Sequence, residues 1–466
     1  MAESPWRRFW EKGLRDTGRD VWLSASALAV GASALAYAIH DNNGNQSPTA
    51  IALLTVAILC AALAVLHPQI PFVERWGDRP AMLILTLAIV GEMGLAFITS
   101  PGIYLRVQPM TFVIHHLLVA VAAVLAGAQL AEKPWLGRTG MALVLGVSFA
   151  LGIWMVISSP APAIDAWYWH RTALQALFKG VDPYSISMPN IYGHTAFYGE
   201  GLATPTQVNV GYPYPPLSLL IAVLGNLFGD YRMANVAAIT AAGGLIAWMR
   251  PGRISRAAAI LFLFSPRELF VVEQGWTEGH VVLMLVGVVF VAARSPRFLR
   301  WAFGALVAVK QYGVLTTPLL ALVVRPGKEW ARVVGGAAAL ALLLTVPMAL
   351  WDVPGFIKSV VLFQAKQPFR AEALSYVAWT ARPDGVPRLP LWFSFAVLPV
   401  PLALSLWRSP RTAAGFGVSS AFAYVMFFGF AKQAFTNYYF MVLAALCAAL
   451  AALAPEAPRS QPEATG

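Results

Sequence analysis

The sequence predicts an all-α polytopic membrane protein that crosses the bilayer about twelve times. Apolar residues occupy 58% of the 466 positions and charged residues only 12%, too few polar groups to cover a soluble globule of this size. Apolar stretches long enough to cross the hydrocarbon layer as helices recur from residue 21 to residue 454. Short alternating segments typical of membrane β-strands do not occur. We therefore expect a multi-pass protein of the cell membrane.

The net charge of +11 is divided among short Lys and Arg clusters between the apolar stretches. These clusters form no continuous stripe, so we expect no nucleic-acid partner and interpret them as markers of cytoplasmic loops. The basic segment before residue 21 then places the N-terminus inside. Cys60 and Cys447 lie within apolar stretches, where we expect small buried side chains rather than a disulfide or a metal pair.

The first five predicted spans cover about residues 21–39, 50–66, 80–98, 109–130 and 140–158. Residues 1–135 hold four of them and form an N-terminal unit to which no motif assigns a role. Glu92, His115 and His116 lie inside these spans, where ionisable groups either mark function or pair with each other across neighbouring helices. The fifth span delivers residues 159–232 to the non-cytoplasmic side.

Within that outside loop, residues 215–228 are apolar but too short to cross, which predicts a re-entrant or interfacial helix. Spans at about 233–249, 257–272 and 280–293 follow. The next apolar stretch, 301–324, has basic clusters on both sides, so we predict a hairpin that dips in from the cytoplasm. Its tip would lie near Lys310.

The remaining predicted spans cover about residues 333–350, 391–407, 412–430 and 438–454. They leave residues 351–390 as a second long outside loop and 431–437 as a short one. Residues 455–466 are rich in Pro, Ala, Glu and Ser, which predicts a disordered tail.

Asp165 follows the fifth span by a few residues and stands among aromatic residues in Asp-Ala-Trp-Tyr-Trp-His-Arg. A carboxylate at the membrane surface beside aromatic rings can act as a general base on a sugar or alcohol hydroxyl. The alternative is an interfacial aromatic belt that carries an incidental charge. The stretch by itself favours neither.

Two further motifs follow in the same loop: Gly-Val-Asp-Pro-Tyr at 180–184 and Tyr-Pro-Tyr-Pro-Pro-Leu at 212–217. With the preceding Asp165, their order resembles the GT-C superfamily of polyprenyl-phosphate-sugar-dependent glycosyltransferases. Among its branches the chain is most similar to glycosyltransferase family 87, the polyprenol-phosphate-mannose-dependent α-mannosyltransferases. The resemblance covers roughly residues 140–454 and implies a GT-C-like catalytic module over residues 136–454. The four spans ahead of it depart from the family pattern.

The resemblance implies that Asp165 takes the proton of an acceptor hydroxyl while polyprenyl phosphate leaves the sugar. It also implies that the sugar is mannose. The donor is a lipid presented from the bilayer, so no nucleotide-sugar pocket and no cofactor are implied. The acceptor would be a lipid or glycan of the cell envelope. Asp182 is either a second acidic contact or, as its Asp-Pro-Tyr setting favours, the cap of a turn.

Lys310 is a site candidate on physical grounds alone, because an ammonium deep in the bilayer needs a compensating partner. A lipid phosphate would serve, with Gln311 and Tyr312 as hydrogen-bond donors. The alternative is a buried ion pair with Glu268 or Glu273.

Other residues of the outside loops offer flat rings, amides and charges to a sugar. The predicted substrate-binding set is Trp169, His170, Arg171, Asp182, Tyr184, Tyr214, Trp276, Glu278, His280, Lys432, Gln433, Asn437 and Tyr438. Interfacial aromatics and helix caps are an equally good explanation for each residue taken alone. No tight His or carboxylate cluster is visible, so we expect no metal.

These observations favour a membrane glycosyltransferase with its site on the non-cytoplasmic face. A lipid-linked glycan transporter or flippase would use the same lysine and rings without a base. A non-catalytic assembly subunit of the cell envelope would need neither.

Overall fold

The computed structural model describes residues 21–66, 76–106, 109–131 and 137–453. The predicted cytoplasmic N-terminus and the predicted tail at 455–466 lie outside these residues. The described chain is helical apart from one short antiparallel pair, β1 (Met188–Pro189) with β2 (Gln207–Val208). The all-α class is therefore confirmed.

Within the described residues, six helices are long and apolar enough to cross a membrane. They are α3 (Pro48–Leu66), α5 (Arg79–Ile98), α6 (Pro109–Leu130), α7 (Gly137–Ser158), α15 (Lys328–Ala349) and α22 (Thr436–Leu453). Large apolar side chains stand on their outer faces: Leu87 on α5 is 64% exposed and Leu343 on α15 is 69% exposed. Such faces are costly in water and suited to lipid, which supports a multi-pass membrane protein.

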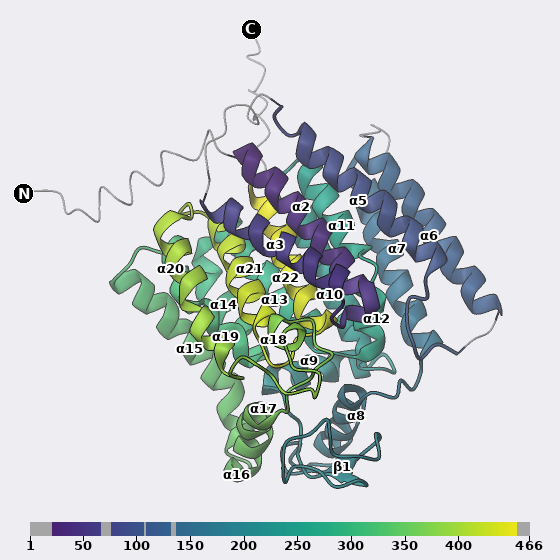
Figure 1. Cartoon of the computed structure of the whole chain (residues 1–466), viewed down its shortest axis with the longest axis vertical. Helices are drawn as coiled ribbons and strands as arrows, with labels where there is room; N and C mark the ends of the chain where they lie inside the picture. The colour runs from purple at the N-terminus through teal and green to yellow at the C-terminus, as the bar shows by residue number, and fades with distance from the viewer. Residues whose placement is uncertain (1–20, 67–75, 107–108, 132–136, 454–466) are drawn as a thin grey trace, which may run out of the picture.

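The N-terminal unit is built from α2 (Val21–His40), α3, α5 and α6, and α2 packs against both α3 and α5. In Figure 1, α5, α6 and α7 run side by side along one flank of the molecule. The structural alternative for Glu92 and the two histidines, pairing with each other, does not hold among the described residues. Both Glu92 oxygens and both His115 ring nitrogens lack a hydrogen-bond partner there, while His115 packs against Trp154 and His116 contacts the Phe97 carbonyl oxygen at 3.1 Å.

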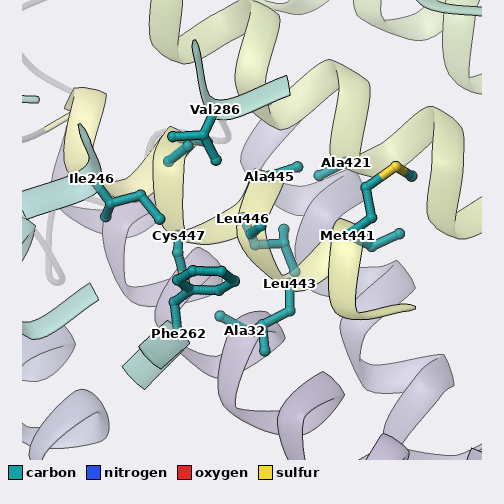
Figure 2. Close-up of a cluster of buried hydrophobic side chains, with 14 of the residues drawn as sticks. Ala32, Ile246, Phe262, Val286, Ala421, Met441, Leu443, Ala445, Leu446 and Cys447 are labelled. Atoms are coloured by element: carbon teal, nitrogen blue, oxygen red, sulfur yellow. The ribbon is translucent and has the colours of Figure 1, made fainter. Parts of the chain in front are cut away.

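The alanine-rich helix α22 lies at the centre of the bundle. It packs against α2, α10 (Arg232–Ala247), α11 (Arg253–Leu263), α13 (Glu278–Arg294) and α21 (Ala413–Gly429). Figure 2 shows Ile246, Phe262 and Val286 gathered around Cys447 and its α22 neighbours. Cys447 is buried, as predicted, whereas Cys60 is only half-buried; both are free thiols. Small side chains on α22 let its neighbours approach closely.

Two predicted spans are interrupted. The stretch 257–272 is not one helix: α11 ends at Leu263, and α12 (Glu268–Gln274) begins after Pro266. Likewise, 391–407 divides into α19 (Phe393–Val397) and α20 (Pro399–Arg408) at Pro399. Proline has no N–H to donate and clashes with the preceding turn, so it starts a new helix rather than continuing one.

The stretch 301–324 turns back on itself. Helix α14 (Leu299–Val309) ends at Lys310, and the 3₁₀ segment η3 (Gln311–Leu322) packs back against α14. A Cβ at Gly313 would lie 2.5 Å from the Leu306 carbonyl oxygen, so glycine is what allows this close return.

The predicted outside loops all meet at one end of the bundle, the lower part of Figure 1, which we call the loop-covered end. It comprises residues 41–47, 99–106, 159–231, 351–392 and 430–435, with the helices α8 (Asp165–Phe178), α9 (Pro216–Asn226), α16 (Val353–Phe356), α17 (Phe363–Lys366) and α18 (Tyr376–Trp379), the π-helical turn η4 (Ile357–Leu362) and the 3₁₀ turn η1 (Asp41–Gly44). Backbone hydrogen bonds join these segments: Gln46 N–H donates to Glu372 and Arg106 N–H donates to Ser158.

The opposite, arginine-rich end comprises residues 248–256, 294–300, 322–332 and 408–412, and includes the 3₁₀ turn η2 (Pro296–Phe298). Arg294 donates to the Trp248 carbonyl, and Arg411 donates to the Ala321 carbonyl. Both ends of the α14–η3 segment therefore lie at the arginine-rich end, and Lys310 stands at its turn.

The two ends should be accessible from opposite sides of the membrane. Single cysteines at the exposed positions Thr380 (loop-covered end) and Lys328 (arginine-rich end) are expected to react with an impermeant maleimide from opposite faces of sealed vesicles. Labelling of both from one side would contradict the topology. A variant with neither substitution gives the background from Cys60 and Cys447.

Candidate functional site

Asp165 is the first residue of α8, which lies across the loop-covered end. Its Oδ1 accepts a hydrogen bond of 2.7 Å from the Ala166 N–H, and its own N–H donates to the Tyr192 hydroxyl at 3.4 Å. The helix buries Trp167, Trp169 and His170 against the loop, while Asp165 remains half-buried. Its carboxylate can therefore be reached by a small hydroxyl group.

Burial raises the pKa of Asp165 to about 6, although the Ala166 N–H and the Arg370 guanidinium act in the opposite direction. A carboxylate with a pKa near 6 is a better proton acceptor than an ordinary aspartate and is still ionised at neutral pH. This combination suits a general base.

The surroundings of Asp165 include residues that sequence reasoning missed. The Asp165 carboxylate adds to the burial effect that raises the pKa values of Tyr192 and Tyr198. Arg370 lies over the Phe197 ring at 4.0 Å and forms an ion pair with Glu372. Arg370 is distant from Asp165 in sequence, and no local pattern marks it.

Lys310 is buried beneath the 159–231 loop and has two polar partners. Its Nζ lies 3.0 Å from Glu278 Oε1 and donates a hydrogen bond of 2.7 Å to Thr277 Oγ1. The expected structural alternative, an ion pair with Glu268 or Glu273, named the wrong partner. Glu278 is available because it begins α13, directly beside the turn between α14 and η3.

The Glu278 carboxylate is bonded on one side only. Oε1 contacts Lys310 and accepts a hydrogen bond from the Tyr312 hydroxyl at 3.1 Å, whereas Oε2 is buried without a hydrogen-bond partner among the described residues. A buried carboxylate oxygen without a partner is costly. It marks this pair as a place where a ligand or water can complete the hydrogen bonding.

Tyr214 connects the two charged groups. Its ring lies 4.3 Å from Lys310 Nζ, and burial together with the Asp165 and Glu278 carboxylates raises the pKa of its phenol. The base candidate and the cation candidate thus both act on one half-buried ring. Tyr438 belongs to the same cluster of rings, since its ring lies 6.0 Å from that of Tyr312.

His170 holds Tyr214 in place rather than facing the open side of the site. Its ring stacks on Tyr231 at 4.4 Å and on Tyr214 at 5.6 Å. Nδ1 contacts the Ala166 carbonyl oxygen at 2.8 Å, so Nδ1 carries the proton and Nε2 accepts from the Tyr212 hydroxyl at 2.9 Å. Burial lowers the pKa of His170 to about 4, with Lys310 adding to this effect, and the ring is neutral at pH 7.

Several predicted binding residues shape the loop instead. Asp182 Oδ1 accepts from the Tyr184 N–H at 3.0 Å, which is the turn cap that its sequence favours. The buried Tyr184 donates its hydroxyl proton to the Tyr214 carbonyl at 3.1 Å. Trp169 is buried too, against Phe363 and Tyr198.

Other predicted site residues connect separate segments of the loop-covered end through hydrogen bonds. Gln311 donates to the Pro213 and Val360 carbonyls, at 3.3 and 3.1 Å. Lys432 donates to the Ala365 carbonyl at 2.9 Å, and Gln433 donates to the Pro368 carbonyl at 2.8 Å. Arg171 is exposed over the Trp167 ring and lies on the outer side of α8.

The last three predicted residues are Trp276, which precedes α13, His280 on α13 and Asn437 on α22. Trp276 is half-buried and its ring is perpendicular to that of Phe270, and Asn437 is buried at the start of α22. His280 is buried, and neither ring nitrogen has a hydrogen-bond partner in the described parts of the chain.

Glu273 anchors the N-terminal unit to the site region. Its buried carboxylate accepts from the backbone N–H groups of Ile103 and Tyr104, both at 2.8 Å. Beside it, the fully buried Arg232 contacts Asp230 and the carbonyls of Glu273 and Val156. The loop after α5 is thereby held against α12.

No group of three or more His, Cys, Asp or Glu residues that could hold a metal ion occurs in the ranges that the structure describes. Comparisons of the chain with known protein families, curated proteins and solved structures find no match.

The Lys310–Glu278 pair should behave as a coupled unit. Lys310→Met leaves Glu278 buried and unpaired and is expected to cost about 3–5 kcal/mol. Lys310→Met combined with Glu278→Gln should recover most of this loss in detergent unfolding experiments. If the two substitutions were additive, the pair would not be coupled.

Asp165 should reduce stability at neutral pH. Its folded-state pKa of about 6 lies above the ordinary value of 3.8, so the folded protein loses stability as pH rises from about 4 to about 6. Asp165→Asn is thus expected to melt at a higher temperature than wild type at pH 8 and at the same temperature near pH 4. A lower melting temperature at pH 8 would contradict the assigned burial cost.

Proposed function

We propose that the protein is a membrane glycosyltransferase that moves a sugar from a polyprenyl-phosphate donor to an acceptor hydroxyl on the non-cytoplasmic side. The observation that carries this proposal is that Tyr214 neighbours both a base candidate and a buried cation: its ring lies 4.3 Å from Lys310 Nζ, and the Asp165 carboxylate contributes to the raised pKa of its phenol. A polyprenyl-phosphate sugar needs both: a base for the acceptor and a positive charge for the leaving phosphate.

In the proposed reaction, the Asp165 carboxylate takes the proton of the acceptor hydroxyl. The acceptor oxygen bonds to the anomeric carbon as the bond from that carbon to the phosphate oxygen breaks. The electron pair of the broken bond stays on the phosphate, where the Lys310 ammonium stabilises the new charge. Polyprenyl phosphate leaves, and Asp165 returns its proton to solvent.

The proposed topology has about twelve crossings, with α14 and η3 as a hairpin that enters from the cytoplasmic side. It is supported by the return of this segment to the arginine-rich end and by the position of Lys310 beside the first residue of α13. Lys310 would then meet a phosphate at the outer edge of the bilayer. The apolar α9, with Leu224 59% exposed, would lie along the same edge.

The resemblance to family 87 points to mannose as the sugar and to a lipid or glycan acceptor of the cell envelope. In this proposal residues 136–454 form the catalytic module. The carboxylate and the lysine need no cofactor for this chemistry. The N-terminal unit would support the module through the Glu273 anchor.

The test is transfer of radiolabelled mannose from a polyprenyl-phosphate donor by purified protein in nanodiscs. Wild-type transfer should rise with pH through about 6 and then level off, because Asp165 must be ionised to accept a proton. Asp165→Asn should lose about 100-fold or more of the rate and still bind donor.

Asp384→Asn is the matched control, since Asp384 is an exposed aspartate of the same end. Normal transfer by Asp165→Asn would refute the role of the base. A lipid-linked glycan transporter would move lipid across vesicles without mannose transfer, and an assembly subunit would do neither.

A further inference from the structure

The pairing of Lys310 with a carboxylate is unexpected in a site for a phosphate leaving group. An unpaired lysine would attract the anion more strongly, yet Nζ lies 3.0 Å from Glu278 Oε1. The Glu278 side chain is completely buried, so its charge is little screened by solvent. Any phosphate that reaches Lys310 also meets this negative charge.

Lys310 can bind a phosphate oxygen without leaving Glu278. An ammonium has three N–H donors, and the structure gives Nζ two acceptors, Glu278 Oε1 and Thr277 Oγ1. The Tyr214 ring covers another side of Nζ at 4.3 Å and favours a cation there. A phosphate oxygen that accepted the third N–H would therefore have the carboxylate beside it.

The donor and the leaving product differ in charge at this point. A polyprenyl-phosphate sugar is a phosphodiester with one negative charge. After transfer, the oxygen that carried the sugar is ionisable, and the monoester has a second pKa of about 6 and a charge of about −1.5 to −2 at neutral pH. Repulsion from a neighbouring carboxylate therefore affects the product more than the donor.

We propose that Glu278 cancels the preference that Lys310 alone would give to the doubly charged phosphomonoester over the singly charged phosphodiester, and thereby promotes release of polyprenyl phosphate. The inference rests on the proposed function, since it concerns the donor and product of that reaction. Glu278 acts through its charge. Because it offsets the Lys310 ammonium, the second negative charge of the product adds little to the product's affinity for the site.

The experiment measures the affinities of polyprenyl-phosphate mannose and polyprenyl phosphate between pH 5 and pH 8, in nanodiscs and in an Asp165→Asn background. That background prevents turnover and removes the one neighbouring group whose pKa, about 6, lies in this range. The other groups around Glu278 are the Lys310 ammonium, His170, His280 and the phenols of Tyr214, Tyr312 and Tyr438.

With Glu278 present, the affinity for the monoester should be nearly constant with pH. In Glu278→Gln it should rise by about ten-fold from pH 5 to pH 8, because the second phosphate charge then meets an unopposed lysine. Affinity for the diester, which does not titrate in this range, should be constant with pH in both proteins.

Glu268→Gln is the matched control, a buried glutamate on α12 outside the Lys310 contacts. It should keep the wild-type ratio of the two affinities. An unchanged ratio in Glu278→Gln, with both lipids bound, would overturn the inference and leave the proposed function intact. Failure of both lipids to bind the Asp165→Asn protein would contradict the proposed function and the inference together.

A second measurement needs no variant at position 278, where the loss of a partner for Lys310 could prevent folding. Polyprenyl sulfate has the shape of the monoester and one fixed negative charge. In the Asp165→Asn protein at pH 8 it should bind within about three-fold of polyprenyl phosphate, because the second charge gains little beside Glu278. Binding of the phosphate ten-fold or more tightly than the sulfate would refute the inference.

Discussion

The buried ion pair between Lys310 and Glu278 is the contact on which the arrangement of the site depends. It fixes the turn between α14 and η3 against the first residue of α13, and Tyr214 and Tyr312 pack around it. Neither charge could remain there alone, since an unpaired ion in a dry interior costs several kcal/mol. A turn that would otherwise be free to withdraw is therefore held at the level of the outer loops.

Polar anchors also join the outer loops to the bundle. Glu273 holds the backbone after α5, Arg232 joins α10 to the loop before it, and His170 links α8 to Tyr212. Each group is buried and hydrogen-bonded, so each position strongly restricts the local backbone. Asp165, by contrast, stands at a helix start with one backbone hydrogen bond and a raised pKa, which is an energetically unfavourable position. Such positions are characteristic of functional groups.

The membrane character, the helical class, the burial of Cys447 and the Asp182 turn could be predicted from local sequence. Apolar length and basic clusters are properties of short windows, and the loops they assign to one side do meet at one end. The partner of Lys310 could not be predicted, because Glu268, Glu273 and Glu278 are all near enough in sequence and only helix packing selects among them. Arg370 was missed because only the folding of the chain brings it near Asp165, from which it is distant in sequence. The helix breaks at Pro266 and Pro399 could have been predicted from the prolines themselves. A hydropathy average over a span-length window does not detect single prolines.

The central position of α22 has a consequence for assembly during synthesis. This helix follows every other described helix in the chain, yet α2, α10, α11, α13 and α21 all pack on it. The earlier helices are therefore synthesised before the helix on which they pack, and the bundle is complete only after α22 has been synthesised. Premature termination before residue 436 would leave a bundle without its central helix, a substrate for membrane quality-control proteases rather than a shortened but folded protein.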